Sequence, residues 1–184
     1  MDKEGRIRPI KREDVAVMHA WELDDEIAYL SGITRPRSLE AFKASYESYF
    51  VKMDNTLRLY SIILNERVIG RIELGLIDRE NGTAAFGIVI GDRDCWGQGY
   101  GKQAILELLK EAFDDLHLHK VYCEVYAFNE RSIRMMQAMD FRQDGVLREH
   151  EYFRNEHHDL VVFSMLQSEF KTKLRGGLSR KVCN

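Results

Sequence analysis

The sequence has little cysteine, little proline and no long apolar run, and each shortage excludes a class of protein. Its three cysteines, Cys95, Cys123 and Cys183, are widely spaced and form no CxxC pair, so neither a disulfide framework nor a zinc site is expected. The most apolar stretches, such as residues 57–64, are much shorter than the roughly 20 residues that a membrane-spanning helix needs. With only two prolines and no Ser/Gly-rich linker, one continuous domain is expected.

The chain is long enough to build its own core. It has 184 residues, of which 45% are hydrophobic and 31% charged, and folding at this length removes roughly 70% of the unfolded surface from water. Residues 1–6 are charged and lack the apolar segment of a secretory signal. We therefore expect a cytoplasmic protein that does not associate with a membrane.

Charge is unevenly distributed along the chain. Residues 171–184 hold five basic side chains and no acidic one, which leaves 22 basic against 30 acidic residues, a formal charge of −8, in the rest of a chain whose total is −3. An acidic body repels nucleic-acid phosphates and tolerates cationic substrates such as amines. The basic tail is either a solvated terminus or a contact for RNA or a ribosome.

Hydrophobic periodicity predicts the element order β-α-α-β-β-β-α-β-α-β-β. The first helix contains Val17, Met18 and Trp21, residues 24–26 interrupt it, and Ser38 caps the second helix. The expected strands cover residues 6–10, 57–64, 68–76, 83–90, 120–126, 146–153 and 159–166. This order predicts an α+β fold, with a mixed, mostly antiparallel sheet of about seven strands, flanked by about four helices and containing one parallel crossover.

A glycine-rich loop follows the strand at 83–90 and precedes the most amphipathic helix. Its three alternate glycines, Gly97, Gly99 and Gly101, let backbone N–H groups turn toward one point at a helix N-terminus, which favours a pyrophosphate ligand. A P-loop would need glycine at Trp96 and Ser or Thr at Gln103, and a dinucleotide fingerprint would need glycine at Lys102. Neither motif fits.

The loop Trp96-Gly97-Gln98-Gly99-Tyr100-Gly101 resembles the Gln/Arg-x-x-Gly-x-Gly/Ala pyrophosphate loop of the GNAT superfamily of acetyl-CoA-dependent N-acetyltransferases. Its W-G-x-G-Y-G form is closest to the branch that acetylates ribosomal-protein N-termini (RimJ/RimL-like). Asn129-x-x-Ser132-x-x-Met135-Met136-x-x-x-Asp140-Phe141 is similar to a second family landmark, Asn-x-x-Ala/Ser-x-x-Leu-Tyr-x-x-x-Gly-Phe. The resemblance covers residues 7–166 and implies a GNAT domain at 1–170 followed by a tail at 171–184.

The resemblance also implies a set of coenzyme-binding residues. The amides of 98–102 would hold the pyrophosphate of acetyl-CoA, and strand residues 88–90 would pair with its pantetheine arm and supply an oxyanion donor. Asn129 would reach the pantetheine or serve only as an N-cap, and Arg131 and Arg134 would bind the 3′-phosphate or remain solvated. The full set is Ile88, Val89, Ile90, Trp96, Gly97, Gln98, Gly99, Tyr100, Gly101, Lys102, Asn129, Ser132 and Arg134.

Two proton-handling groups of the family are missing. Met136 stands where many relatives have a tyrosine general acid, and residues 84–86 lack the glutamate that some relatives have. Glu73, Tyr126 and His150, with its neighbour Glu151, are the catalytic candidates, unless each is an ordinary strand residue. Neutralising a lysine-like amine at pH 7 costs roughly 4.6 kcal/mol, but a chain-terminal amine only about 1 kcal/mol. The acceptor is therefore expected to be a protein N-terminus or a small amine of similar basicity.

Alternatives remain open at this point. A polyamine or aminoglycoside acetyltransferase would suit the acidic body, and a non-catalytic acyl-CoA sensor would suit Met136. Direct transfer without an acetyl-cysteine is expected, because Asp94 and Glu124 adjoin Cys95 and Cys123 and would raise their pKa values. No metal is expected, since adjacent ligands at 157–159 would point to opposite faces of a strand. The family resemblance implies a homodimer.

Overall fold

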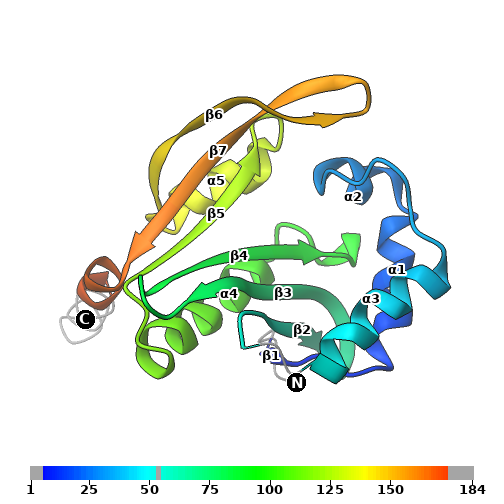
Figure 1. Ribbon diagram of the computed structural model, residues 1–184, viewed down its shortest axis with the longest axis horizontal. Coiled ribbons are helices and arrows are strands. Elements are labelled where there is room, and N and C mark those ends of the chain that lie inside the picture. The colour runs from blue at the N-terminus through cyan, green and yellow to red at the C-terminus, as the bar shows by residue number, and fades with distance from the viewer. Residues whose placement is uncertain (1–5, 53–54, 174–184) are drawn as a thin grey trace.

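A seven-stranded mixed sheet organises the molecule, with helices packed against it (Figure 1). The computed structural model describes residues 6–52 and 55–173. The strands are β1 (Arg6–Pro9), β2 (Arg58–Leu64), β3 (Arg67–Asp78), β4 (Thr83–Ile90), β5 (Lys120–Tyr126), β6 (Arg142–Phe153) and β7 (Glu156–Leu166). Their order in the sheet is β1-β2-β3-β4-β5-β7-β6. The predicted α+β fold is confirmed.

Five α-helices connect these strands within the described residues: α1 (Asp14–Glu22), α2 (Asp25–Leu30), α3 (Leu39–Lys52), α4 (Tyr100–Lys110) and α5 (Glu130–Ala138). A 3-10 turn (Arg93–Cys95) precedes α4, a π-helical turn (Glu111–Asp115) follows it, and residues 167–173 form a short helical end. No helix in the described part of the chain is long and apolar enough to cross a membrane. Most of the predicted basic tail, residues 174–184, lies outside the described residues.

One helix was not predicted. Residues 24–26 do end α1, but they also begin α2, because the Asp24 carboxylate accepts hydrogen bonds from the N–H groups of Glu26 and Ile27, both at 3.0 Å. An N-capping aspartate therefore starts a helix where the sequence suggested only an interruption. Within α1, Met18 and Trp21 are buried, whereas Val17, which the sequence placed on the same helix face, is 44% exposed.

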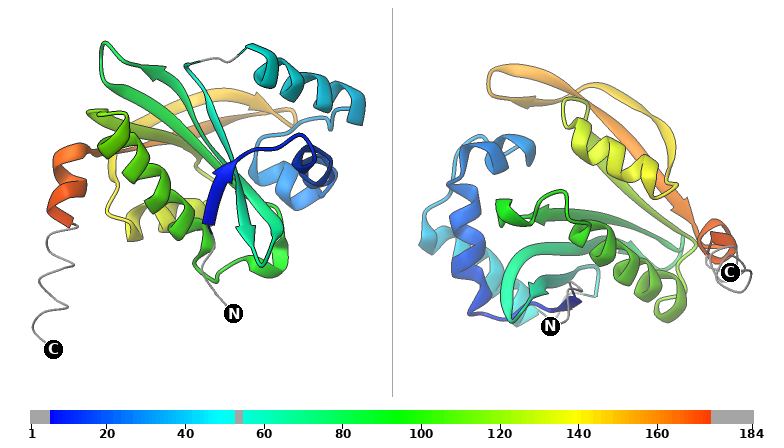
Figure 2. Two further views of the ribbon diagram at one scale, coloured as in Figure 1. Left: turned by 90° about the horizontal axis from the view of Figure 1, so that it is seen from below. Right: turned by 180° about the vertical axis from the view of Figure 1, so that it is seen from behind.

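The sheet separates two hydrophobic cores. One face packs on α4 and α5 through residues such as Ile72, Leu74 and Ile105, and the other packs on α1 and α3 through residues such as Met18 and Phe42. Figure 2 shows the group α1–α3 set apart from α4 and α5. Because side chains alternate between the two faces of a strand, successive residues of β3 and β4 pack against different groups of helices.

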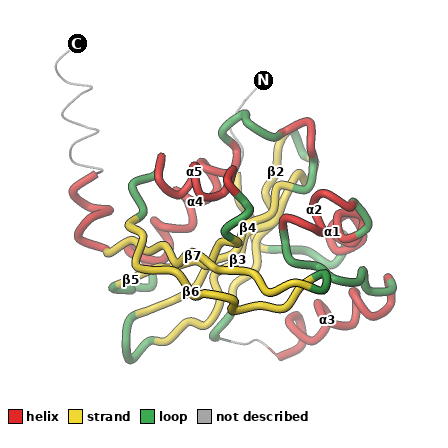
Figure 3. The backbone as a smooth tube through the Cα atoms, turned by 90° about the horizontal axis from the view of Figure 1, so that it is seen from above, coloured by secondary structure: helices red, strands yellow, loops and turns green. Residues whose placement is uncertain are grey.

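The strands β4 and β5 diverge, and this divergence creates the site. They pair in parallel only at Thr83–Ala85 against Lys120–Tyr122, and they separate beyond that point (Figure 1). From Phe86 to Ile90, β4 keeps its pairing with β3 alone, so its other edge is open. The β6–β7 hairpin extends beyond β5 toward α2 (Figures 1 and 3), where the rings of Tyr29 and Phe153 lie 5.8 Å apart.

Candidate active site

The glycine loop presents a row of backbone donors at the start of α4. Gly97 and Gly99 have φ angles of 73° and 90°, a left-handed conformation that favours glycine, and Gly99 is the N-cap of α4. The first backbone N–H that bonds back into the loop is that of Gln103, to the Gly99 carbonyl at 3.1 Å. The N–H groups of the first helical turn have no intrahelical acceptor, so they are available to an anion together with the positive end of the helix dipole.

A cleft of about 460 Å³ lies in front of this loop. It brings together all but one of the predicted coenzyme-binding residues: Ile88, Val89, Ile90, Trp96, Gly97, Gly99, Tyr100, Gly101, Lys102, Asn129, Ser132 and Arg134. Gln98 does not line the cleft, because its side-chain amide turns back to donate to the Asp94 carbonyl. Ile27, Leu30 and Ser31 of the α2 segment complete the wall.

Trp96 links the loop to the open end of β4. Its indole Nε1 donates to the Ile90 carbonyl at 2.7 Å, and the guanidinium carbon of Arg131 lies 3.6 Å from the ring centroid. Arg93 lies over the same ring at 5.3 Å and forms ion pairs with Asp24 and Glu26 at the start of α2. The coenzyme loop, the edge of β4 and α2 are therefore held in one cluster of contacts.

The two arginines of α5 differ in environment. Arg131 is partly buried, and this burial lowers the pKa of its guanidinium, whereas Arg134 is 67% exposed and pairs with Glu130 at 2.8 Å. Both line the cleft. An anionic ligand would relieve the charge on Arg131 more directly than that on Arg134, which already has a carboxylate partner.

Asn129 is confirmed as the N-cap of α5. Its side-chain oxygen accepts from the Ser132 N–H at 3.1 Å, and its side-chain nitrogen donates to the Leu30 carbonyl at 3.2 Å. The amide therefore ties the end of α2 to the start of α5, on opposite sides of the cleft. Its predicted contact with pantetheine stays a prediction.

These features fit a coenzyme A molecule. The donors at the helix start suit a diphosphate, and the open edge of β4 suits an extended arm that pairs with backbone. A Cβ on Gly97 or Gly99 would meet nothing within 4 Å, so ligand atoms have room to approach the loop. The cleft shares part of its wall with a second cavity.

The second cavity, of about 210 Å³, lies between the diverging strands. It shares Leu30, Ser31, Ile88, Val89, Asn129, Ser132 and Met135 with the first cleft and adds Arg71, Glu73, Phe86, Gly87, Cys123, Glu124, Val125, Tyr126 and Met136. Two of the three catalytic candidates, Glu73 and Tyr126, therefore lie at the end of the coenzyme cleft.

The Glu73 side chain lies in the space left by the missing side chain of Gly87 on β4. It stands directly across from Gly87 in the β3–β4 register, and a Cβ on Gly87 would lie 3.1 Å from Glu73 Oε1. The other carboxylate oxygen, Oε2, accepts from Arg71 Nη1 at 2.9 Å. Both side chains remain about one-third exposed, at 31% for Arg71 and 35% for Glu73.

Arg71 is a residue that the sequence analysis missed. It precedes Glu73 by two positions on β3, so the two side chains share a face of the sheet. That alternation was the available signal, but the sequence could not show that Tyr46 and Glu73 would both accept hydrogen bonds from Arg71.

The Tyr126 hydroxyl acts as a hydrogen-bond donor in this structure. Its hydroxyl donates to the Glu151 carboxylate, and its ring lies against Gly32, where a Cβ would stand 2.1 Å from the hydroxyl oxygen. Burial, the hydrogen bond to Glu151 and the charge of Glu151 all raise the pKa of Tyr126. The phenol therefore stays protonated at neutral pH and is a weaker acid than a free tyrosine.

The structure does not bring His150 to the cavities. The register of β6 against β7 is irregular between Leu147 and Glu151, and Glu149 has a φ of 50°. Regular strand alternation is lost at this irregularity. His150 is exposed and lines neither cavity, while its neighbour Glu151 reaches Tyr126.

The sulfur-containing side chains near the site form part of the wall. Met136, at the family's usual tyrosine position, is 1% exposed, and the thiol of Cys123 lies 3.6 Å from its sulfur. Burial raises the pKa of the Cys123 thiol to about 12, and burial together with Asp92 raises that of Cys95. Neither thiol is ionised at neutral pH.

No metal-binding cluster is found within residues 6–52 and 55–173. His157 packs on Tyr152 at 5.1 Å between ring centroids, whereas His158 contacts Phe128 at the same distance. The two adjacent histidines thus contact different aromatic rings.

A helix start with N–H donors facing a cleft, an open strand edge and a carboxylate at the end of the cleft fit an acyltransferase that uses an acyl-coenzyme A. The acetyltransferase (GNAT) domain family matches residues 6–142. An uncharacterized N-acetyltransferase of Bacillus licheniformis, p20, is 30% identical over 172 residues, covering 89% of this chain and 93% of that protein.

Two further similarities concern acceptors. A putative ribosomal N-acetyltransferase of Bacillus subtilis, YdaF, is 29% identical over 110 residues, covering 60% of each protein. The crystal structure of Vibrio cholerae spermidine N-acetyltransferase in complex with CoA and spermine has a TM-score of 0.83 and 23% identity, and covers 92% of this chain and 99% of that one.

The chain belongs to the GNAT acetyltransferase family. It is an acetyl-CoA-dependent N-acetyltransferase, as the sequence analysis predicted. The alternative of a non-catalytic acyl-CoA sensor is not favoured by this membership.

Proposed function

We propose that this protein transfers the acetyl group of acetyl-CoA directly to a primary amine, either a protein N-terminus or a small amine, inside the cavity between β4 and β5. The observation that carries the proposal is the meeting of the two cavities along Ile88 and Val89, with Glu73 just beyond them. The thioester would lie at this junction, next to the unpaired edge of β4.

Each step of the transfer has a group near this junction. The amine nitrogen attacks the thioester carbon, the new C–N bond forms, and the C–S bond breaks with its electron pair going to sulfur. A backbone N–H of residues 88–90 stabilises the carbonyl oxygen. Glu73 takes the proton released by the amine, directly or through water, and solvent returns a proton to the thiolate.

A second acceptor class has its own support. Glu73 and Glu124 line the cavity, which favours a cationic acceptor, and the likeness to a spermidine acetyltransferase makes a polyamine the second candidate. The resemblance to the RimJ/RimL-like branch, which would favour a protein N-terminus, stays a prediction. So does the homodimer.

Thiol release from acetyl-CoA, measured with a ribosomal-protein N-terminal peptide, spermidine and an aminoglycoside, tests the proposal. We expect turnover with at least one of them and a fall of about a hundredfold in Glu73→Gln at neutral pH. Coenzyme affinity should change little in this variant. Full activity of Glu73→Gln, or no turnover of any amine by protein that binds the coenzyme, would contradict the proposal.

A further inference from the structure

The acceptor cavity contains a guanidinium group with unused donors. Arg71 lines the cavity, and its side-chain hydrogen bonds, to Tyr46 at 3.4 Å and to Glu73 at 2.9 Å, both come from Nη1. Its Nε and Nη2 have no partner among residues 6–52 and 55–173. Because every fully buried side-chain nitrogen or oxygen in that part of the chain is hydrogen-bonded, these two nitrogens are reached by solvent.

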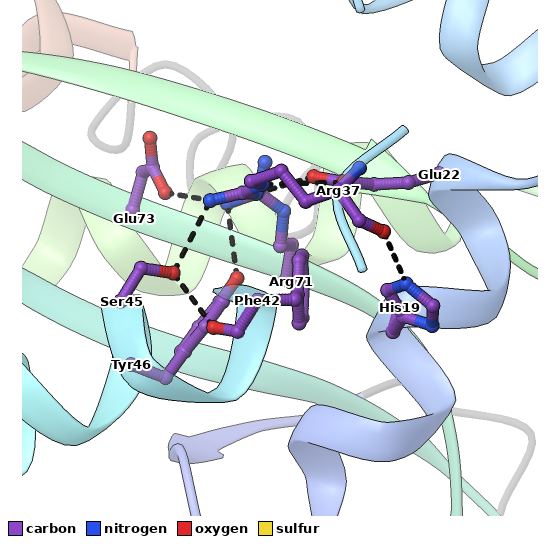
Figure 4. A network of polar contacts seen from close by, with 8 residues as sticks. All are labelled: His19, Glu22, Arg37, Phe42, Ser45, Tyr46, Arg71 and Glu73. Carbon is purple, nitrogen blue, oxygen red and sulfur yellow. Dashed lines mark hydrogen bonds and ion pairs between the residues drawn. The ribbon is translucent and has the colours of Figure 1, made fainter. Parts of the chain in front are cut away.

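Two arginines and two glutamates form the charged network around Arg71 (Figure 4). Glu22, the other acid of this network, is engaged by Arg37, whose backbone N–H and guanidinium donate to both oxygens of its carboxylate. Arg37 also donates to Ser45 at 3.2 Å. Glu73 is therefore the acid that Arg71 contacts directly.

Only one of the two carboxylate oxygens of Glu73 accepts a hydrogen bond within the described ranges. Its Oε2 accepts from Arg71, while Oε1 faces Gly87 and has no hydrogen-bond partner within the described ranges. One side of the cavity thus offers, within a single ion pair, an acceptor for an ammonium or amine N–H and donors for an oxygen.

We propose that this Arg71–Glu73 pair selects acceptors that carry an oxygen next to the amine, that is, an α-aminoacyl group, with the amine at Glu73 and the oxygen at Arg71. The inference rests on the proposed function and names its substrate class. An amino acid or a peptide N-terminus presents the amine nitrogen and the carbonyl oxygen three bonds apart, within the reach of one ion pair. A polyamine has no oxygen to offer Arg71 and brings further cations toward a guanidinium.

Paired acceptors test this selectivity. Alaninamide and isopropylamine share a branched amine and differ in the carbonyl group, and rates divided by the concentration of neutral amine remove the difference in their basicity. We expect wild-type kcat/KM to favour alaninamide by about tenfold or more, the value of a hydrogen bond to a charged group. Spermidine should be the poorer substrate on the same scale.

Two variants separate selection from catalysis. Arg71→Met should reduce the preference for alaninamide to within about threefold, mainly by raising its KM, whereas Glu73→Gln should slow both amines by a similar factor. Arg71→Lys keeps the charge without the planar fork and should give an intermediate preference, which provides a readout if Arg71→Met folds poorly.

Each outcome bears on the inference. Equal wild-type rates for the two amines, a preference for spermidine, or an unchanged preference in Arg71→Met would overturn it while leaving acetyl transfer intact. No turnover of any amine by coenzyme-binding protein would overturn the proposed function itself. Free alanine and a short peptide, as further acceptors, distinguish an amino acid from a protein N-terminus.

Discussion

Glu73 Oε1 lies 3.1 Å from the position that a Cβ would take on Gly87, its direct neighbour across β3 and β4. The missing side chain at position 87 gives the carboxylate its place at the point where β4 loses its β5 partner. Gly87 therefore affects the reaction only indirectly, by setting the position of the Glu73 carboxylate.

Gly87→Ala should displace the Glu73 carboxylate by a few tenths of an ångström and lower kcat by about tenfold, because small misplacements of a reacting group are costly. Coenzyme affinity should be unchanged, and stability should not fall. Steady-state kinetics and calorimetric titration with coenzyme measure these effects. Gly75→Ala is the matched control, since its Cβ would make only an ordinary 3.5 Å contact with Leu57. Equal activity of both variants would contradict this role of Gly87.

Trp96→Phe should weaken coenzyme binding about fivefold. The change keeps an aromatic ring beside Arg131 but removes the Nε1 hydrogen bond to Ile90, whose net value is about 1 kcal/mol. The Ile90 carbonyl then no longer anchors the loop to β4. Calorimetric titration with coenzyme A measures the change in Kd. An unchanged Kd with intact folding would show that the indole bond does not position the loop.

Local signals were enough to predict the glycine loop and the helix cap that line the cleft. The alternate glycines predicted N–H groups that turn toward one point at a helix start, and the motif beginning at Asn129 predicted a helix cap, because both depend on residues within a few positions of each other. Strand periodicity predicted the sheet for the same reason. The α2 helix was missed because an N-capping aspartate such as Asp24 and a helix-breaking aspartate look alike in sequence.

The acceptor side could not be predicted equally well. Arg71 acquires its environment from Tyr46 and Glu22, which are 25 and 49 positions away and belong to other elements. His150 lies outside both cavities, next to an irregular register in β6 that the sequence does not reveal. Long-range packing and strand irregularities decide both cases, and neither leaves a periodic signal.

Direct transfer predicts that Cys123→Ala and Cys95→Ala keep their turnover within about threefold of wild type. A thiol whose pKa is raised to about 12, as that of Cys123 is, is protonated at neutral pH and is a weak nucleophile. Mass spectrometry after incubation with acetyl-CoA should find no acetyl-cysteine in the wild-type protein. A loss beyond a hundredfold in a folded variant, or a trapped acetyl-cysteine, would contradict direct transfer.

Asp14 should make the stability of the fold depend on pH. Burial alone would raise the pKa of its carboxyl, but hydrogen bonds from Arg8, Ser61 and the Lys11 N–H outweigh burial, and the pKa is lowered in the folded protein. The unfolded chain, with an Asp pKa of about 3.9, then binds more protons than the folded one. The stabilisation is therefore complete above that value and is lost as the pH falls through the lower folded pKa.

Asp14→Asn should accordingly destabilise the protein by about 2 kcal/mol at pH 7, because it removes the buried charge that pairs with Arg8 and replaces one of the two acceptor oxygens with a donor. The difference from wild type should shrink below about pH 4, where the wild-type carboxyl in the unfolded state is protonated. Urea unfolding between pH 3 and 8 measures both curves. Asp140→Asn is the control, since Asp140 is 76% exposed and its pair with Lys173 is a surface one. A constant difference between wild type and Asp14→Asn over the whole range would mean that Asp14 contributes through packing and not through its charge.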